Sequence, residues 1–235
     1  MFFVNRGILK LLRISGVLRS PVHHIVVADL PEYTFHEDRF FELSTPGFQS
    51  VLRAKSVVFL FGRFFRDYAN FEKHQDIIRT FFTPVPEIQA MVNATLRGAK
   101  TGAGLVVGIH IRRGDYAQFV DGKYFYSQVE YRAQMERLQS LDVSRKIRFI
   151  ICSNESIQKE VFEGLDVCQG PGHLAGDMYT LAACDLIMGP PSTYTLWASF
   201  YGKTPLYQIR DLNKSFDSKD FVILPPERLY NFNLN

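Results

Sequence analysis

Polar residues able to bind an anion follow a short apolar run near the middle of the chain. Residues 107–111, mostly β-branched, predict a strand that contains His110, and Arg112, Arg113 and Asp115 come directly after it. In open α/β sheets, ligands bind outside the carboxyl ends of the strands. Guanidinium groups at such an end favour an anion with paired, planar acceptors, which means a carboxylate or a phosphate.

A second segment supplies further polar residues that we expect at the same edge. Asp177 opens one apolar stretch, and Ser192, Thr193 and Tyr194 open the next. Ser192 is a good N-cap residue, and the N–H groups of Thr193 and Tyr194 would lie in the first turn of a helix, where anions are favoured. Asp177 is also a good N-cap for a helix beginning at the next residue, so its carboxylate has both a structural and a binding interpretation.

Metal chemistry is not indicated by the sequence. The chain has no His-Glu-x-x-His, no Cys-x-x-Cys and no Asp-x-Asp motif. Its three cysteines, Cys152, Cys168 and Cys184, lie in stretches that read as core, so we expect reduced thiols. We therefore expect no metal ligands and no bound cofactor.

Composition and charge limit the class of partner. The chain has 235 residues, of which 46% are hydrophobic and 21 are Phe, enough for a sizeable core. The net charge is +3, and the 27 Lys and Arg residues are scattered along the chain instead of clustered. A phosphate-bearing small molecule is therefore a better expectation than a nucleic acid.

Strands and helices alternate in the second half of the chain. We expect strands at 24–29, 57–61, 105–111, 147–152, 186–188 and 205–209, and helices at 87–96, 124–141, 155–163, 178–184 and 192–201. Such alternation is typical of a parallel, doubly wound α/β sheet. We assign residues 105–235 to a Rossmann-like nucleotide-binding lobe and residues 1–98 to a smaller or incomplete N-terminal lobe, joined by a loop at 100–104.

The N-terminus is apolar but interrupted by charge. Within residues 1–18, Arg6, Lys10 and Arg13 leave no uninterrupted apolar span long enough to cross a membrane. Two interpretations stay open: a solvated helix of the first lobe, which we prefer, and a basic amphipathic helix that touches a membrane surface. We expect a cytoplasmic protein, with any membrane contact made peripherally at the inner face.

Both polar segments resemble motifs of a known family. His110-Ile-Arg-Arg-Gly-Asp-Tyr116 resembles the His-x-Arg-Arg-Gly-Asp signature of α-1,2-fucosyltransferases, glycosyltransferase family 11, and more distantly that of α-1,6- and protein O-fucosyltransferases. About 60 residues downstream, Asp177, Cys184 and the segment 192–197 match the family pattern of Asp, Cys and Ser-Ser/Thr-Phe-Ser-x-Trp at the same spacings. The resemblance covers residues 105–210, whereas the Gly-Leu-Gly-Asn-Gln stretch that opens many members is missing.

The resemblance implies a GT-B-like fold and a glycosyltransferase. The implied reaction is an inverting, metal-independent transfer of fucose from GDP-fucose to a glycan hydroxyl in α-1,2 linkage, in bacterial polysaccharide biosynthesis. The implied partners are the GDP-sugar donor and an oligosaccharide or lipid-linked glycan acceptor. A second interpretation stays open, because the opening stretch is missing: a non-catalytic remnant that binds a nucleotide sugar or a protein partner.

Site roles follow from the resemblance together with the chemistry. Arg112 is our candidate for the diphosphate contact that stabilises the leaving group, and Ser192, Thr193 and Tyr194 would add contacts from a helix N-terminus. Arg113 points to the opposite face by strand alternation, so we expect a secondary or structural contact, such as a pair with Asp115.

Three further side chains have more than one interpretation. Asp177 could accept from the two adjacent N–H donors of guanine, and His110 could contact the base or the ribose, although a buried histidine is often simply core. The general base is the least determined role. Asp115 is one candidate and Asp121 the other, and Asp115 could equally hold its loop by accepting backbone N–H bonds.

Overall fold

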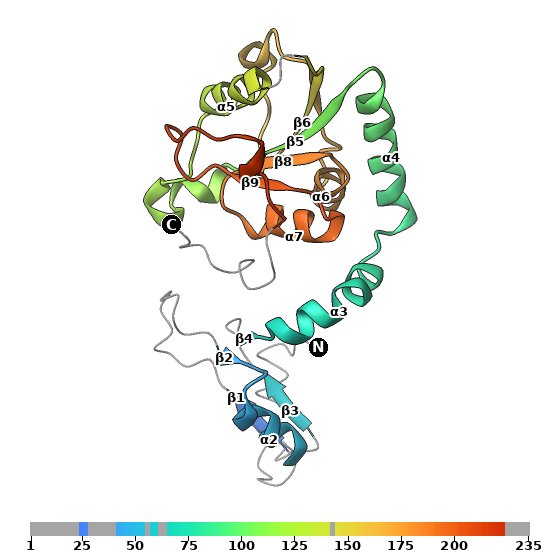
Figure 1. Ribbon diagram of the computed structural model, residues 1–235, viewed down its shortest axis with the longest axis vertical. Coiled ribbons are helices and arrows are strands. Elements are labelled where there is room, and N and C mark those ends of the chain that lie inside the picture. The colour runs from blue at the N-terminus through green and yellow to red at the C-terminus, as the bar shows by residue number, and fades with distance from the viewer. Residues whose placement is uncertain (1–23, 28–40, 55–56, 61–64, 142–143, 224–235) are drawn as a thin grey trace. The chain divides into compact units, whose positions relative to one another are not determined.

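The chain divides into two structural units, with the main boundary after Gln75. The computed structural model describes residues 24–27, 41–54, 57–60, 65–141 and 144–223 (Figure 1). One unit comprises Met1–Gln75 with Asn231–Asn235, and the other comprises Asp76–Tyr230. This division lies earlier than the predicted boundary at residues 98–105. The helix that we assigned to the end of the first lobe belongs instead to the second unit, because it packs on that unit's sheet.

The first unit contains two short pairs of parallel strands. Strand β1 (His24–Val27) pairs with β3 (Val57–Leu60), and β2 (Phe41–Glu42) pairs with β4 (Phe65–Arg66). Helix α2 (Pro46–Ala54) lies between β2 and β3 in the chain. Strands β1 and β3 fall within the predicted ranges 24–29 and 57–61. The predicted amphipathic segment at 1–18 lies outside the described residues.

The second unit is built on a five-stranded parallel sheet, which confirms the predicted α/β class. The strand order is β7-β6-β5-β8-β9, so the chain leaves the central strand in one direction and returns on its other side. A sheet wound in this way places ligand-binding crevices at the carboxyl ends of its strands. The strands are β5 (Leu105–Ile111), β6 (Ile147–Ser153), β7 (Val167–Gln169), β8 (Leu186–Gly189) and β9 (Leu206–Gln208).

Helices cover both faces of this sheet (Figure 1). Helix α5 (Gln128–Leu141) packs its buried side chains against the odd-numbered residues of β5, such as Ile109, which are fully buried. Helices α4 (Pro86–Lys100), α6 (Leu174–Ala182) and α7 (Thr193–Gly202) cover the other face, where α6 contacts both α4 and α7. No helix among the described residues is long and apolar enough to cross a bilayer.

Helix α6 approaches the central strand so closely that a side chain at Gly108 of β5 would displace its neighbours. A Cβ on Gly108 would lie 2.6 Å from Leu181 Cδ2 and 3.1 Å from Cys184 Sγ. The motif residue Cys184 therefore packs as a small core side chain at this contact, and its thiol donates to Thr180 O at 3.2 Å. The three cysteines are free, and burial raises the pKa of the Cys152 and Cys184 thiols.

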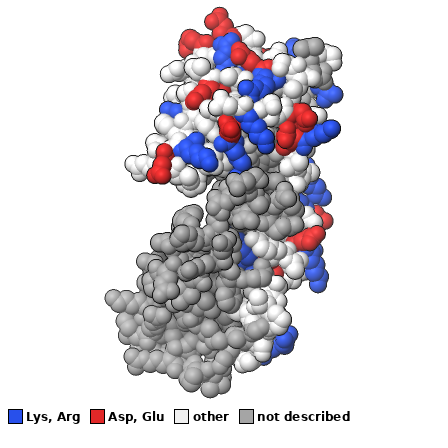
Figure 2. Space-filling model, turned by 60° about the vertical axis from the view of Figure 1, so that its left-hand side comes forward, with Lys and Arg blue, Asp and Glu red and all other residues white. Residues whose placement is uncertain are grey.

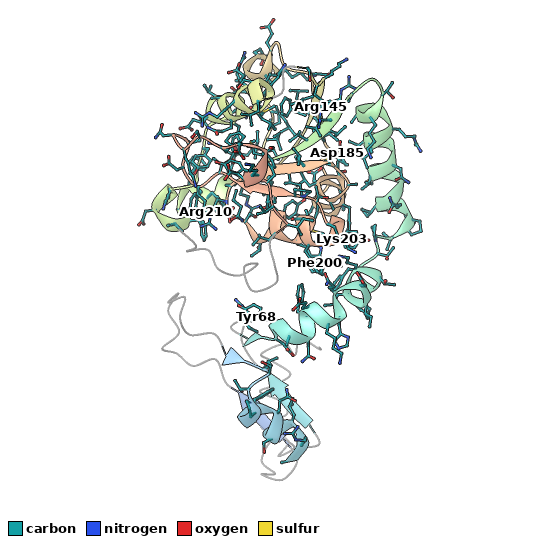
Figure 3. The ribbon with its side chains drawn as sticks, viewed as in Figure 1. Tyr68, Arg145, Asp185, Phe200, Lys203 and Arg210 are labelled. Carbon is teal, nitrogen blue, oxygen red and sulfur yellow. The ribbon has the colours of Figure 1, made fainter. Side chains whose placement is uncertain are left out.

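The end of helix α3 (Tyr68–Phe81) is fixed to α7 within the second unit. Arg79 Nε donates to Phe200 O at 2.8 Å, and Lys203 lies 3.6 Å from Asp76. Phe200 and Lys203 lie beside this part of α3 in Figure 3. At the amino ends of the strands, Asp185 Oδ2 accepts from Val106 N at 2.8 Å and holds the start of β5.

Two helices of this unit begin at residues other than those predicted from the sequence. Helix α5 was expected from residue 124 but begins at Gln128, since Ser127 and Glu130 form reciprocal capping bonds: Ser127 N donates to Glu130 Oε2 and Glu130 N donates to Ser127 Oγ. Helix α6 was expected from residue 178 but begins four residues earlier, with His173 Nδ1 as the cap acceptor from Gly176 N.

Two further differences concern shorter elements. The helix expected at 155–163 is a single 3₁₀ turn, Lys159–Phe162, and it leads into the short strand β7, which we did not predict. The helix expected at 87–96 continues to Lys100, so Gly98 lies inside α4 and does not end it.

A matched pair of glycine substitutions tests the packing at β5. Gly108→Ala should lower the free energy of unfolding by about 1–3 kcal/mol, because the added methyl overlaps α6. Gly98→Ala should raise it by about 0.5–1 kcal/mol, because a Cβ there meets nothing within 4 Å and alanine favours a helix. Urea unfolding measures both changes. Equal effects of the two substitutions would contradict the close approach at Gly108.

Candidate functional site

A cavity lies at the carboxyl edge of the sheet and is lined by several of the predicted anion-binding residues. Its volume is about 150 Å³, and we call it the arginine cavity. Strand β5 contributes His110 and is followed directly by Arg112, and β6 contributes Ser153 and is followed directly by Asn154. Helices α6 and α7 and the preceding loop complete its wall with Gly172, Leu174, Asp177 and Tyr194.

A second cavity adjoins the first along the same edge. Its volume is about 270 Å³, and it lies over the ends of β6 and β7. We call it the β6–β7 cavity. The two cavities share Ser153, Gly172 and Asp177 as lining residues, so a ligand longer than either one could extend through both.

Arg112 carries the positive charge of the arginine cavity. Its side chain is 31% exposed, and Nη2 lies 2.8 Å from Asp115 Oδ1. Arg112 thus pairs with Asp115, whereas we had suggested that Asp115 pairs with Arg113 or holds its loop through backbone bonds. Asp115 is 63% exposed, so this pair adds little stability and leaves both groups accessible to a ligand.

Arg113 points away from the cavity, to the α5 face of the sheet. Its guanidinium lies 3.8 Å from the centre of the Phe125 ring, and Nη1 donates to Tyr126 O at 2.8 Å. Nε lies 3.3 Å from Glu155 Oε2. These contacts occupy the guanidinium with protein groups, and Arg113 is not among the residues that line either cavity.

His110 is a buried histidine with an unused nitrogen. It is 5% exposed, and Nδ1 has no hydrogen-bond partner among the described residues. Burial, and then the charge of Arg112, lowers the pKa of His110 to about 3, so the ring is neutral at physiological pH. The ring packs 4.9 Å from that of Tyr194, whose hydroxyl donates to Leu174 O at 2.6 Å.

Asp177 is a buried carboxylate shared by both cavities. It is 6% exposed, and Oδ1 accepts from Gly172 N at 2.9 Å. Burial raises the pKa of Asp177, and the backbone N–H donors partly oppose that rise. Because His173 caps α6, the predicted N-cap role of Asp177 is wrong. The carboxylate instead holds the loop before the helix and faces the cavities.

The remaining residues of the downstream motif are mainly structural. Ser192 Oγ accepts from Tyr194 N at 3.1 Å, which is the predicted N-cap contact of α7. Neither Ser192 nor the exposed Thr193 lines the two cavities, and of these three neighbours only Tyr194 does. Trp197 packs against Phe82, with ring centres 5.0 Å apart, as part of an aromatic cluster.

The chain at the ends of β6 and β7 also contributes to the site, although the sequence did not predict it. The cavities are lined by Ser153 at the end of β6, by Asn154 and Glu155 directly after it, and by Gly170 after β7. A Cβ on Gly170 would lie 2.9 Å from Asp177 Oδ1, so that position requires glycine. The signal was present, because polar residues at the end of a buried strand mark the binding edge in the same way as those after β5.

The described residues hold no group of metal ligands, and the face drawn in Figure 2 carries charges of both signs. Within the described residues, no three His, Cys, Asp or Glu side chains gather as metal ligands. On the face shown in Figure 2, basic and acidic side chains are interspersed.

The low pKa of His110 predicts an effect of acid on stability. The folded protein keeps His110 neutral, while the unfolded chain takes up a proton below about pH 6.5, so stability falls as the pH drops from 6.5 toward 3. Asparagine does not titrate. The stability difference between wild type and His110→Asn should therefore shrink by about 1.4 kcal/mol per pH unit between pH 6 and pH 4. Urea unfolding across this range measures it, and a constant difference would show that His110 is protonated in the fold.

Comparison with solved structures identifies a similar fold. The chain matches a mutant of Arabidopsis thaliana FUT1, solved in complex with GDP, with a TM-score of 0.50 and 14% sequence identity. The match covers 83% of this chain and 53% of that one, so this chain spans about half the length of the plant protein. At this identity the likeness concerns the fold. A comparison with curated protein sequences gave no match.

Comparison with family models extends over nearly the whole chain. The model described as glycosyl transferase family 11 matches residues 17–221, which include all residues of the two cavities. The match also covers most of the first unit, beyond the region where the motifs alone carried the resemblance. The chain belongs to glycosyl transferase family 11.

Proposed function

We propose that this chain binds GDP-fucose and transfers fucose to a glycan hydroxyl, in α-1,2 linkage and with inversion at the anomeric carbon. The observation that carries the proposal is the pair of Arg112 and Asp177, which open into adjoining cavities at the carboxyl edge of the sheet. Membership of family 11 and the likeness to a GDP-bound fold support it. The acceptor that we propose is an oligosaccharide or a lipid-linked glycan.

Arg112 is placed to bind the diphosphate. When the bond between the sugar and the β-phosphate breaks, the bonding electrons leave with the phosphate oxygen, and negative charge builds there. A fixed guanidinium stabilises that charge more in the transition state than in the ground state. Arg112 uses Nη2 for Asp115, and its other N–H donors suit a bidentate contact with phosphate oxygens. This charge fills the role that a metal ion has in other enzymes, so we propose a metal-independent reaction.

Asp177 is placed to recognise guanine. Guanine offers two adjacent donors, the N1–H and the exocyclic amine, to a single carboxylate, whereas adenine offers no such pair. The carboxylate of Asp177 is buried, which raises its pKa, and the bonds that it accepts from the backbone N–H groups of Gly172 and His173 oppose only part of that rise. Donors from a guanine would stabilise the charged form further. A base in the β6–β7 cavity and a diphosphate in the arginine cavity would use the lining residues that the two cavities share.

Asp115 is our candidate for the general base. Its exposed carboxylate lies 2.8 Å from Arg112, beside the position proposed for the reacting phosphate. There it can take the proton from an acceptor hydroxyl as the hydroxyl oxygen attacks the sugar. Asp121, the other candidate from the sequence, is exposed in the 3₁₀ turn Phe119–Gly122 and has a φ of 53°. Neither Asp121 nor Asp115 lines the two cavities, so the choice of Asp115 rests on its contact with Arg112.

Binding of GDP in the presence of a chelator tests this proposal. Calorimetry with GDP and EDTA should give a dissociation constant in the micromolar range, about −7 to −8 kcal/mol. ADP should bind more weakly, because it lacks the donor pair for Asp177. Loss of GDP binding on adding EDTA, or equal affinity for ADP, would contradict the proposed donor site.

Donor turnover separates the enzyme from a non-catalytic remnant. An active enzyme should release GDP from GDP-fucose, slowly to water and faster when a suitable glycan is added. A chain that binds GDP-fucose but releases no GDP with any of a panel of glycans would favour the remnant.

Asp177→Asn tests base recognition apart from folding. The asparagine Oδ1 can still accept from Gly172 N, so the melting temperature should stay within a few degrees of wild type. Its amide would direct N–H donors at the N–H donors of guanine. GDP affinity should therefore fall by about 10- to 100-fold while ADP affinity changes little, since a hydrogen bond to a charged group contributes roughly 1.5–3 kcal/mol.

Both readouts of Asp177→Asn are needed. A large fall in melting temperature with the preference for GDP intact would mean that Asp177 serves only to hold its loop. Glu160→Ala, which removes an exposed carboxylate from the 3₁₀ turn before β7, is the matched control and should change neither quantity.

A further inference from the structure

Two residues after β6 lie outside every motif of the sequence, yet they contact the backbone beside Arg112. We propose that Asn154 and Glu155 are positioning residues, which hold the turn after β5 so that Arg112 faces the arginine cavity. We call these two residues the turn clamp. The inference rests on the proposed role of Arg112 toward the donor diphosphate, and it concerns how that arginine is held.

The turn clamp replaces the strand partners that β5 lacks at its end. The parallel ladder between β5 and β6 ends at the pair Ile111 and Ser153, so the next N–H groups have no strand to donate to. Arg113 N donates instead to Asn154 Oδ1 at 3.0 Å. Gly114 N donates to Glu155 Oε1 at 3.1 Å. The backbone of Arg112 is thus fixed on one side by the ladder and on the other by two side chains.

The conformation of Gly114 fits this arrangement. Its φ of +63° is a value that residues with a Cβ rarely adopt, and a Cβ there would lie 3.1 Å from Asn154 Nδ2. The chain therefore reverses directly after Arg113 and passes against the clamp. This explains why a glycine follows the two arginines in physical terms, without any contact between that glycine and a ligand.

The charge of Glu155 needs Arg113 beside it. Glu155 lines the β6–β7 cavity, where Asp177 already places one buried carboxylate. An unpaired second carboxylate would repel a ligand that carries phosphate groups. Glu155 Oε2 lies 3.3 Å from Arg113 Nε, which balances that charge. The two arginines thus have different roles. Arg112 faces the arginine cavity, and Arg113 compensates the negative charge of Glu155.

Three variants of the turn clamp should weaken GDP binding, two of them strongly and one of them less. Glu155→Ala removes both contacts of the carboxylate and should weaken GDP binding by roughly tenfold, about the effect of misplacing one charge-assisted hydrogen bond. Glu155→Gln should lose less, since its carbonyl oxygen can still accept from Gly114 N. Asn154→Ala should resemble Glu155→Ala. Circular dichroism checks that each variant is folded, and Glu160→Ala is the control for charge.

A double-mutant cycle shows whether the clamp acts through Arg112. In an Arg112→Ala background the clamp has no arginine to position, so adding Glu155→Ala should change GDP affinity less than twofold. A full tenfold loss in that background would mean that Glu155 binds the nucleotide itself, and the positioning role would be wrong.

A readout without nucleotide keeps the inference separate from the proposed function. In ¹⁵N NMR of the free protein, Arg112→Lys identifies the Nε–Hε signal of Arg112 by its disappearance. That signal should shift or broaden in Glu155→Ala and remain in place in Glu160→Ala. If wild type binds no GDP but this signal moves, the donor site is wrong and the clamp stands. If GDP binds to wild type and to Glu155→Ala equally and the signal is unmoved, the clamp is wrong and the donor site stands.

Discussion

The parallel register between β5 and β6 is the constraint on which the site depends. The two strands pair along their whole length, from Leu105 with Ile147 to Ile111 with Ser153, so both end at the same level of the sheet. The polar residues that follow each strand must then meet at one edge. A slip of one residue would turn Arg112 to the α5 face and send Arg113 into the cavity. The fully buried apolar residues of both strands prevent such a slip.

The two faces of β5 explain why one strand can serve both core and site. The odd-numbered residues Val107, Ile109 and Ile111 are fully buried against α5 and form a continuous apolar layer. On the other face the strand carries Gly108, which admits α6 closely, and then His110. Because α6 approaches so near, its first turn brings Asp177 to the end of the strand. The glycine thus sets the position of an acidic residue that lies far from it in sequence.

The sequence predicted those elements whose own residues determine them. Strand β5 was predicted in full because an uninterrupted apolar run has few alternatives, and α7 because Ser192 is a strong N-cap. The start of α6 was missed, since its cap is the ring of His173, an uncommon acceptor, after a stretch with Pro171 and two glycines. The start of α5 was missed although Ser127 and Glu130 carry the spacing of a capping box. Apolar periodicity alone had extended that helix through the tyrosines before it.

The candidate site was predictable in some of its residues but not in their pairing. Arg112, Asp177 and His110 could be chosen from their place at strand and helix ends. The partner of each charged side chain depends on how the loops turn after the strands. The loop conformation in turn depends on hydrogen bonds between residues about 40 positions apart, such as the bond from Gly114 N to Glu155 Oε1. Hence the sequence suggested Arg113 for Asp115, whereas the structure pairs Asp115 with Arg112.

Two groups in the site are held in states that would be unfavourable in an ordinary core. His110 is buried, and its Nδ1 has no hydrogen-bond partner in the part of the chain that the structure describes. Burial also raises the pKa of Asp177, so the folded protein bears part of the cost of desolvating this carboxylate. A buried polar atom without a partner costs about 1–3 kcal/mol, so a core selected only for stability would replace it. Both groups line the arginine cavity. A ligand that donates to Asp177 and hydrogen-bonds to His110 would recover this free energy on binding, and the site is therefore partly desolvated before the ligand arrives.

The exposed pair of Arg112 and Asp115 also suits its position, because the attraction between two exposed charges is weak. The guanidinium therefore stays available to a doubly charged phosphate, which competes more strongly than one exposed carboxylate.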